Sequence, residues 1–295
     1  MVTWKGKTRG NTLGYRIFIF ILKTFGLSAS YFSLKFVALY FFFFSKKSYN
    51  ALYFFYNRVL GYSKIKSSRS IFKNFVNLGE TLLDKTAFMA GFKTKFKFDF
   101  DGENYLRDMA INTGGILISA HIGNFEMAAN MLERINTKVN IIVLDAEHEK
   151  IKNLLNNVLK TTVNIIPLKN DMSHLFIINN AIENKEIICI HGDRFIDGER
   201  TIEMNFMKNK ALIPAGPFHL ALLYKVPVSF VFAMKDSNYK YHFYASKPKI
   251  YDVFKNRTNR NTEILGIVND YISEFEKMIK LYPLQWFNHY QFWNK

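Results

Sequence analysis

Acidic residues are missing from the first 79 positions of the chain, which carry 13 lysines and arginines. The first acid is Glu80, and from there to residue 295 the remaining 27 basic residues are nearly balanced by 24 acidic ones. The formal net charge of +16 is therefore a property of the N-terminal quarter. Clustered positive charge attracts nucleic acid, anionic membranes or acidic proteins. Other features of the sequence decide between these three classes of partner.

Cysteine is almost absent too. The single Cys189 excludes an internal disulfide and a cysteine-based metal cluster, which fits a reducing compartment. It lies within the apolar run EIICIHG (186–192), so we expect a buried strand residue without a chemical role. The Gly-x-Ser-x-Gly elbow of serine hydrolases is also missing, which disfavours a serine lipase.

Uninterrupted apolar stretches of ~20 residues, the length of a confident membrane-spanning helix, are lacking as well. The N-terminal region instead has apolar runs at 17–22 and 36–44, separated by lysines. Three arrangements stay open: a span over 26–44 with Lys35 reaching the interface, two amphipathic helices in the interface, or a phenylalanine-rich hairpin on the protein's own core. We favour interfacial attachment through a helical segment at 1–70.

Aromatic residues are abundant, and they help to choose between the possible partners of the basic region. They make up 17% of the chain and include 30 phenylalanines. Basic side chains beside aromatic clusters suit an anionic membrane surface, where each lysine or arginine contributes ~1 kcal/mol. Nucleic acid fits less well, because the cations lie between phenylalanine runs and no base-reading module is recognisable. We therefore expect a membrane partner and no nucleic acid.

Residues 71–295 alternate between strand and helix patterns. Short apolar runs predict strands, and apolar residues three and four positions apart predict helices between them. In chain order we expect a strand at 114–120, a helix at 124–135, a strand at 139–145, a helix at 148–160, a strand at 163–168, a helix at 172–184 and a strand at 186–192. After a polar loop follow a helix at 214–225, a strand pair at 226–235 and 239–247, and a helix at 260–281. This order predicts one α/β domain with a central, largely parallel (mixed) sheet flanked by helices.

The segment SAHIGNFEMA (119–128) places His121 at the end of the first predicted strand and Glu126 in the following helix. Five residues within one helix turn through ~140°, so the two side chains can share a crevice only if His121 precedes the helix. In open α/β sheets, ligands bind at this edge. Glu126 could then fix the imidazole tautomer and leave the other nitrogen free to take a proton from a hydroxyl group. A structural histidine beside a first-turn acid is the alternative.

The start of the same helix offers backbone N–H groups. Those around Gly123 and Asn124 would be free in the first turn of a helix, so they could stabilise an oxyanion or orient an anionic group. Asn124 can equally be a plain N-cap. We count both residues as candidates for substrate binding.

Four blocks of the chain, in order, resemble the bacterial lipid A late acyltransferases, a family within the lysophospholipid acyltransferase superfamily. The blocks are AHIGNFE (120–126), GDR (192–194), FMKNKALIPAGPFHLA (206–221) and YPLQWF (282–287). The offset from the histidine to a glutamate is that of the lipid A branch, whereas other members of the superfamily have a shorter offset that ends in aspartate. One position departs from the family pattern, because Lys208 stands where a glycine is usual.

The resemblance implies a membrane-associated O-acyltransferase that moves a fatty acyl chain from acyl carrier protein, or less often coenzyme A, to a hydroxyl of a lipid A precursor. His121 would be the catalytic base and Glu126 its support, without a metal or an organic cofactor. Such an enzyme would act at the cytoplasmic face of a bacterial inner membrane, with acyl carrier protein, the lipid acceptor and the anionic membrane surface as partners. Acylation of another membrane lipid or pigment, and non-catalytic lipid binding, stay open as alternatives.

Further candidates for substrate binding come from the second half of the chain. Asp193 and Arg194 should reach the same sheet edge as His121, where Asp193 could position the histidine or the acceptor hydroxyl and Arg194 could hold a phosphate or the phosphopantetheine arm. Arg200 belongs to a basic loop that could steer an acidic carrier protein. Gly216 could shape a turn whose N–H groups meet an anion. The alternatives are a surface turn pair for Asp193 and Arg194, a solubilising loop for Arg200 and a purely structural turn for Gly216.

Two more expectations concern aromatic rings. We expect His191 to be a strand histidine with a satisfied ring. An interfacial belt at the membrane and a packed cap on the domain are the two possible roles of the last aromatic residues, Trp286, Phe287, Tyr290, Phe292 and Trp293.

Overall fold

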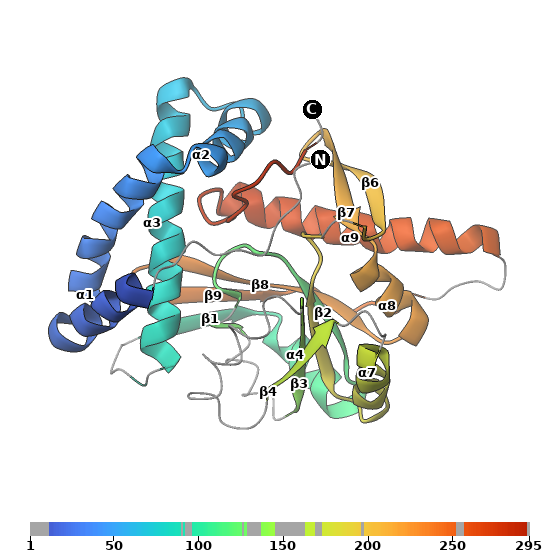
Figure 1. The fold of residues 1–295 in the computed structure, drawn as a ribbon. Coiled ribbons are helices and arrows are strands. Elements are labelled where there is room, and N and C mark those ends of the chain that lie inside the picture. The colour runs from blue at the N-terminus through green and yellow to red at the C-terminus, as the bar shows by residue number, and fades with distance from the viewer. Residues whose placement is uncertain are drawn as a thin grey trace.

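A computed structural model gives the fold of the chain (Figure 1). It describes residues 12–89, 91, 96–125, 127–128, 137–144, 163–168, 173–195, 198–251 and 257–293. The predicted helix at 148–160 and most of the one at 124–135 lie outside these residues. The other predicted elements can be compared with the structure directly.

Seven strands form the central sheet. Along the sheet their order is β1 (Lys97–Asp101), β9 (Lys240–Ala245), β8 (Val228–Ser237), β2 (Gly115–Ser119), β5 (Ile187–His191), β3 (Val139–Leu144) and β4 (Val163–Leu168). Neighbouring strands are parallel except β8 and β9, which are antiparallel because only a two-residue turn at 238–239 connects them. The predicted largely parallel, mixed sheet is confirmed.

Helices cover both faces of this sheet: α4 (Glu103–Asn112), α7 (Ser173–Glu183), α8 (Gly216–Tyr224) and α9 (Arg257–Leu281). Successive side chains of a strand point to opposite faces. Accordingly, Ile116 and Ile118 of β2 belong to the main core with residues of α8 and α9, whereas Leu117 between them packs with Met109 of α4. Figure 1 shows α9 along one side of the sheet and α4 on the other.

A β-hairpin occupies part of the polar loop that the sequence predicts after β5. It consists of β6 (Thr201–Phe206) and β7 (Asn209–Pro214), which pair antiparallel. Its turn residues Met207 and Lys208 have φ angles of 51° and 62°, in the left-handed region that glycine adopts at low cost. This conformation gives a physical reason for the glycine that the family usually has at position 208. The prediction of a loop alone is wrong here. The hairpin was not predicted because Met207 and Lys208 are not residues that usually form a hairpin turn.

The N-terminal region is helical, with α1 (Thr12–Phe44), α2 (Lys46–Tyr53), a π-helical turn η1 (Phe54–Val59) and α3 (Lys64–Met89). α1 is kinked at Gly26, whose φ of 78° and ψ of −177° are not helical. α1 and α3 lie side by side (Figure 1). The two helices pack closely at Gly79, because a Cβ there would lie 2.4 Å from the side chain of Leu34. α3 runs across the proposed division between residues 70 and 71, which stays a prediction.

One face of α1 is apolar and exposed. The segment Ile17–Phe44 is long and apolar enough to cross a membrane, and only 28% of its most apolar window is buried in the protein. Its exposed large apolar residues are Ile17, Phe20, Phe25, Phe32, Phe36, Leu39, Tyr40, Phe43 and Phe44. By contrast, Leu52, Phe55 and Tyr56 of α2 and η1 belong to the main core. The region therefore combines a face on the domain with a face suited to lipid. The kink at Gly26 lies where the possible span over 26–44 would begin, so interfacial attachment and that span both stay predictions.

The last aromatic residues form a packed cap on the domain. Trp286, Phe287, Phe292 and Trp293 are buried, and Trp286 makes edge contacts with Phe55, Phe206 and Phe275. Of the two predicted roles, the structure supports the cap. Cys189 packs partly buried against the smaller core beside α4, and loss of hydration raises the pKa of its thiol to about 12. It has the inert environment that the sequence predicts.

Candidate active site

Two adjacent parallel strands bring a histidine and an aspartate to one edge of the sheet. β2 and β5 pair so that Ser119 lies opposite His191. Two residues beyond these strand ends, the chain reaches His121 after β2 and Asp193 after β5. Because both strands run in the same direction, the two residues meet at the same carboxyl edge, where open α/β sheets bind ligands.

Asp193 holds the side chain and the backbone of His121 at once. Its Oδ1 lies 2.8 Å from Nδ1 of the imidazole, and its Oδ2 accepts a hydrogen bond of 3.0 Å from the backbone N–H of His121. The side chain of Asp193 is 2% exposed, whereas that of His121 is 14% exposed. The carboxylate is therefore out of reach of a substrate, while the ring is partly open to it.

The charge on Asp193 decides which nitrogen of His121 carries a proton. Burial by itself raises the pKa of Asp193, but the facing His121 and Arg194 outweigh burial, and the net pKa lies below its ordinary value. An ionised carboxylate only accepts hydrogen bonds, so Nδ1 of a neutral His121 donates and Nε2 keeps its lone pair. In this tautomer the ring can accept a proton from a hydroxyl group at Nε2.

A second histidine packs against the first. The ring centroid of His191 is 4.4 Å from that of His121 and 4.5 Å from that of Phe125. Burial, together with the charge of His121, lowers the pKa of His191 to about 3, so its ring is neutral at pH 7. Its Nδ1 is buried and has no hydrogen-bond partner among the described residues. The satisfied ring that we expected for His191 is therefore not found.

The same residues have a geometry that could hold a cation. His121, His191 and Asp193 each offer a ligand atom within 4.8 Å of the others. A cation that used Asp193 would compete with the two hydrogen bonds that this carboxylate accepts from His121. The residues thus fit proton transfer better than metal binding, and independence from metal stays a prediction.

The segment 284–287 supports the loop that carries His121. Phe287 donates its backbone N–H to the carbonyl of His121 at 3.1 Å, and Gly123 donates its own to the carbonyl of Gln285 at 2.9 Å. This segment resembles the family in sequence, but no role was predicted for it. The sequence feature that could have indicated its role is Gln285, a polar residue between leucine and tryptophan. Gln285 is buried in the structure.

The backbone N–H groups of Gly123 and Asn124 are not free, so the prediction that they await an oxyanion is wrong. The partner of the first is the Gln285 carbonyl, and the second donates to the carbonyl of Ala233 at 2.7 Å. The first donor fastens the loop to the segment 284–287, and the second fastens it to β8. Gly123 has a φ of 63°, and a Cβ there would lie 2.0 Å from the Ala233 oxygen, so glycine is required for this close approach.

Asn124 is an N-cap, which was the alternative reading of this residue. Its Oδ1 accepts a hydrogen bond of 3.2 Å from the backbone N–H of Met127. Its Nδ2 donates to the carbonyl of Thr81 at 3.1 Å and to the hydroxyl of Tyr241 at 3.2 Å. The side chain is 3% exposed, so it joins the His121 loop to α3 and β9 inside the protein.

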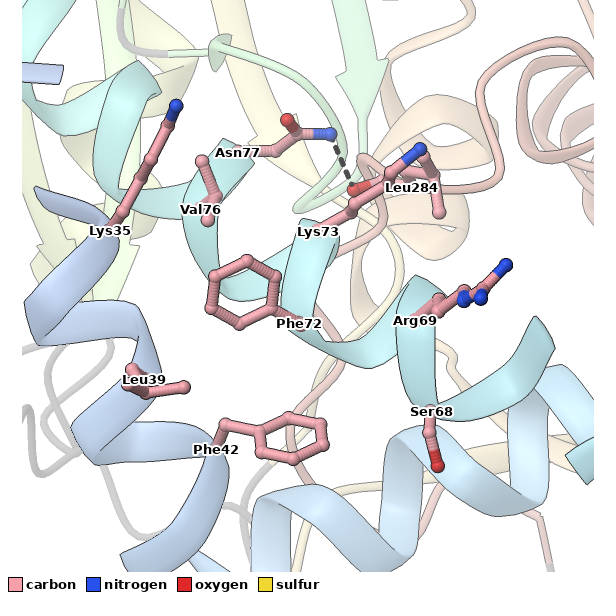
Figure 2. Close-up of a pocket in the computed structure, with 10 residues that line it drawn as sticks. All are labelled: Lys35, Leu39, Phe42, Ser68, Arg69, Phe72, Lys73, Val76, Asn77 and Leu284. Atoms are coloured by element: carbon pink, nitrogen blue, oxygen red, sulfur yellow. Dashed lines mark hydrogen bonds between the residues drawn. The ribbon is translucent and has the colours of Figure 1, made fainter. Parts of the chain in front are cut away.

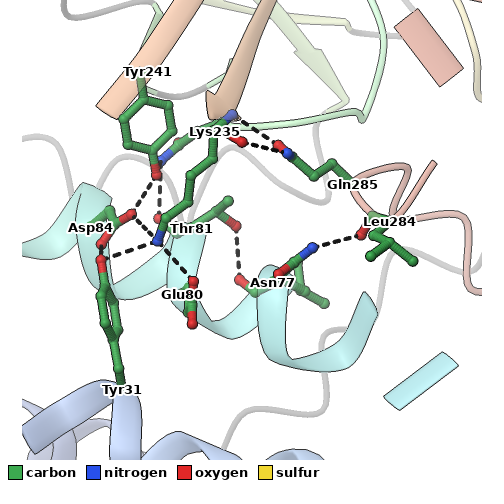
Figure 3. Close-up of polar contacts among 11 residues, drawn as sticks. Tyr31, Asn77, Glu80, Thr81, Asp84, Lys235, Tyr241, Leu284 and Gln285 are labelled. Carbon is green, nitrogen blue, oxygen red and sulfur yellow. Dashed lines mark hydrogen bonds and ion pairs between the residues drawn. The ribbon is translucent and has the colours of Figure 1, made fainter. Parts of the chain in front are cut away.

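A buried ion cluster lies next to these contacts (Figure 3); we use this name for Lys235, Glu80, Asp84, Tyr31 and Tyr241. The ammonium of Lys235 is 2.8 Å from a carboxylate oxygen of Glu80 and 2.8 Å from one of Asp84. Tyr31 and Tyr241 both donate their hydroxyls to Asp84. The cluster therefore joins α1, α3, β8 and β9 close to the loop of the candidate site.

The remaining predicted substrate-binding residues have different surroundings. Arg194 donates from Nη2 to the carbonyl of Phe287 at 2.9 Å, so it helps to anchor the segment 284–287. Arg200 is exposed, and its carbonyl accepts a hydrogen bond from the backbone of Ala215. Gly216 is exposed at the start of α8, and a Cβ there would meet no atom within 4 Å. A close approach does not require glycine at this position.

Glu126 lies outside the residues that the structure describes, so its predicted contact with His121 stays a prediction. The ring nitrogen that the described residues engage is Nδ1, and its partner is Asp193. The role of tautomer control, which the sequence analysis gave first to Glu126, is already filled by the geometry of Asp193.

A family model described as bacterial lipid A biosynthesis acyltransferase matches residues 9–295. The chain belongs to this family. The resemblance of the four sequence blocks is thereby confirmed, and this lipid A acyltransferase family member is an O-acyltransferase that acts on membrane lipid. Its apolar, exposed α1 fits the membrane association of the family.

Comparison with individual proteins adds little to the family assignment. Among solved structures, the acyltransferase is similar to the 1-acyl-sn-glycerophosphate (LPA) acyltransferase PlsC from Thermotoga maritima, with 13% sequence identity over 82% of this chain and 96% of that chain. The TM-score is 0.39, so we base no argument on this likeness. No curated protein matches the chain.

Proposed function

We propose that this acyltransferase moves a fatty acyl chain from acyl carrier protein, or alternatively from coenzyme A, to a hydroxyl group of a lipid A precursor. The observation that carries the proposal is the pair of His121 and Asp193 at the carboxyl edge of the sheet. The family supports the acceptor. The basic, acid-free stretch before Glu80 supports a location at the cytoplasmic face of a bacterial inner membrane, where the leaflet is anionic.

In the proposed reaction, His121 is the general base. The acceptor hydroxyl gives its proton to Nε2 while its oxygen forms a bond to the carbonyl carbon of the thioester. The tetrahedral intermediate then collapses, the C–S bond breaks, and the proton on Nε2 passes to the departing thiolate. No covalent acyl-enzyme is formed. Asp193 stabilises the imidazolium between the two steps, and base catalysis of this kind contributes about 10²–10⁴-fold.

Two carboxylates are candidates for positioning the base. We assign the role first to Asp193, because its oxygens already engage both Nδ1 and the backbone of His121. If Glu126 were bonded to Nε2 instead, it would block the nitrogen that has to take the proton. We therefore expect Glu126 to contribute without occupying Nε2 in the free enzyme.

The basic residues in the β6–β7 hairpin and directly before it support docking of an acidic carrier protein. Arg200 and Lys208 are exposed, and neither has a carboxylate partner in the described part of the chain. Lys210 nearby is paired with Glu203 at 2.7 Å. Exposed cations of this kind mainly raise association rates, so we propose that the KM for the carrier-bound donor rises with ionic strength.

The test is turnover by the purified full chain with acyl carrier protein and coenzyme A thioesters and a panel of acceptors. His121→Ala should lower kcat by about 10³-fold while the chain stays folded. His242→Ala, a partly exposed histidine on β9, is the matched control and should keep its activity. Retained turnover in His121→Ala would reject the base. Acylation of a glycerolipid or a pigment, but not of a lipid A precursor, would reject the acceptor.

A further inference from the structure

A groove between α1 and α3 has an apolar interior (Figure 2). Leu39 and Phe42 of α1 face Phe72 and Val76 of α3 across it, and the rings of Phe42 and Phe72 are 6.2 Å apart. Its volume of about 650 Å³ lies within the range of ~300–1,000 Å³ that is typical of small-molecule sites. Displacement of water from such apolar walls by a hydrocarbon chain is favourable, because it removes apolar surface from water.

Cations border the groove. Lys35, Arg69 and Lys73 are exposed at its edges, and Figure 2 shows their charged ends extending away from the apolar side chains. Within the described part of the chain, no carboxylate pairs with any of the three. A ligand with an anionic head and an apolar tail is complementary to this combination of rim and interior.

The groove opens beside the exposed apolar face of α1. Phe36, Tyr40 and Phe43 lie one turn or less from the lining residue Leu39, and they are 63%, 58% and 63% exposed. A face of this composition lies in the headgroup and acyl boundary of a bilayer. Lipid can therefore enter the groove laterally, without leaving the membrane.

We propose that this groove binds one anionic glycerophospholipid of the membrane. One acyl chain packs between Leu39, Phe42 and Phe72, and the phosphate lies against Arg69 and Lys73, with Lys35 on the opposite side. The lipid is a bound partner and is not acylated. The site does not depend on the proposed base or acceptor, so it can be tested without turnover.

The experiment is native mass spectrometry of the full chain in an uncharged detergent, titrated with phosphatidylglycerol or with phosphatidylcholine of the same acyl chains. We expect one phosphatidylglycerol per chain and much weaker retention of phosphatidylcholine. Arg69→Ala with Lys73→Ala should weaken phosphatidylglycerol binding about 30-fold, from ~1 kcal/mol for each cation. Lys46→Ala with Lys47→Ala removes the same charge at the exposed start of α2 and should leave binding unchanged.

A second pair of variants tests the shape of the site. Val76→Trp fills the interior and should abolish binding, whereas Phe36→Trp, outside the lining, should not. Equal losses in the two pairs of cation variants would mean diffuse surface charge and would overturn the proposal. Retention of the lipid by Val76→Trp would overturn it as well. A third result would also overturn it. If the double variant Arg69→Ala with Lys73→Ala raised the KM for the acceptor in an assay without phosphatidylglycerol, the groove would be an acceptor subsite.

Discussion

Replacing Asp193 by asparagine keeps the size of the side chain but reverses one hydrogen bond. The amide oxygen can still accept from the backbone N–H of His121, and the amide nitrogen would then donate to Nδ1. The proton of the ring moves to Nε2, which can no longer act as a base. We expect kcat to fall on the order of 10³–10⁴-fold with little change in KM.

Steady-state kinetics of Asp193→Asn test this expectation. Asp270→Asn is the control, because Asp270 accepts hydrogen bonds from Lys249 and Tyr251 near the surface. A normal kcat in Asp193→Asn, together with a collapse of kcat in Glu126→Gln, would transfer the positioning role to Glu126.

The buried His191 makes stability depend on pH. Its pKa falls from 6.5 to about 3 on folding, so between these values the unfolded chain binds a proton that the folded chain does not. The free energy of unfolding should therefore decrease as the pH falls through this window, by about 1.4 kcal/mol per pH unit from this group. His191→Gln should flatten the slope, measured by denaturant unfolding in detergent. An unchanged slope in His191→Gln would contradict the prediction.

Single residues of the site could be predicted to different degrees. The meeting of His121 and Asp193 follows from strand direction, since both come directly after parallel strands. The engagement of the N–H groups of Gly123 and Asn124 could not be foreseen. Their acceptors lie on β8 and in the segment 284–287, more than 100 residues away along the chain, and local sequence carries no trace of such pairings.

Among the elements, the contact of α3 with β8 depends on the buried ion cluster. The side chain of Lys235 is 7% exposed and that of Asp84 is 0% exposed. Removal of one partner leaves an uncompensated buried charge, so Lys235→Met should cost about 3–5 kcal/mol of unfolding free energy. Lys235→Met with Asp84→Asn should regain part of it. Lys240→Met, which removes an exposed pair with Asp99, should change little, and an equal loss there would contradict this account.

The packing of α1 on α3 can be tested at Gly79. Alanine in a helix interior normally stabilises by about 0.5–1 kcal/mol relative to glycine, and Gly266→Ala in α9 should do so because its surroundings are open. Gly79→Ala should instead destabilise by about 1–3 kcal/mol, because the new Cβ would displace the side chain of Leu34, which is buried. In a Leu34→Ala background the sign should reverse. A double-mutant cycle by thermal unfolding measures this, and simple additivity would exclude the contact.

Element prediction succeeded where apolar patterns were strong. β2, β3, β4 and β5 are short apolar runs between glycines or polar residues, and all four fall within the predicted ranges. β1, α4 and the β6–β7 hairpin were missed. The hairpin turns through Met207 and Lys208 at positive φ, where the usual turn residues are absent. β1 is a short edge strand whose partner, β9, follows much later in the chain.

For the whole molecule, the asymmetry of charge and exposed aromatic surface predicts how the protein is held at a membrane. Phe36→Ser with Phe43→Ser should release the protein from the membrane fraction, because two large apolar side chains no longer enter the bilayer. Phe176→Ser with Ile177→Ser removes exposed apolar residues from α7 and should not. Flotation on anionic vesicles at low and high salt measures the effect, and equal release by both pairs would contradict it.

The class of the whole molecule could be predicted further than its details. The order of strands and helices gave the mixed sheet, and the four sequence blocks gave the family. The sequence could not predict that one face of α1 is exposed and one face of η1 is buried, because phenylalanine and tyrosine occur on both faces. Only packing against the cap at 286–293 distinguishes them.

The pairing of Phe287 and Gln285 with the His121 loop has a consequence for biosynthesis. Position 121 is translated long before position 287. A nascent chain therefore already contains His121 while the backbone partners of the His121 loop are still untranslated. Acyl transfer should begin only after translation of this last stretch, and a premature stop codon shortly before Leu284 should yield an inactive protein that retains every residue of the catalytic pair.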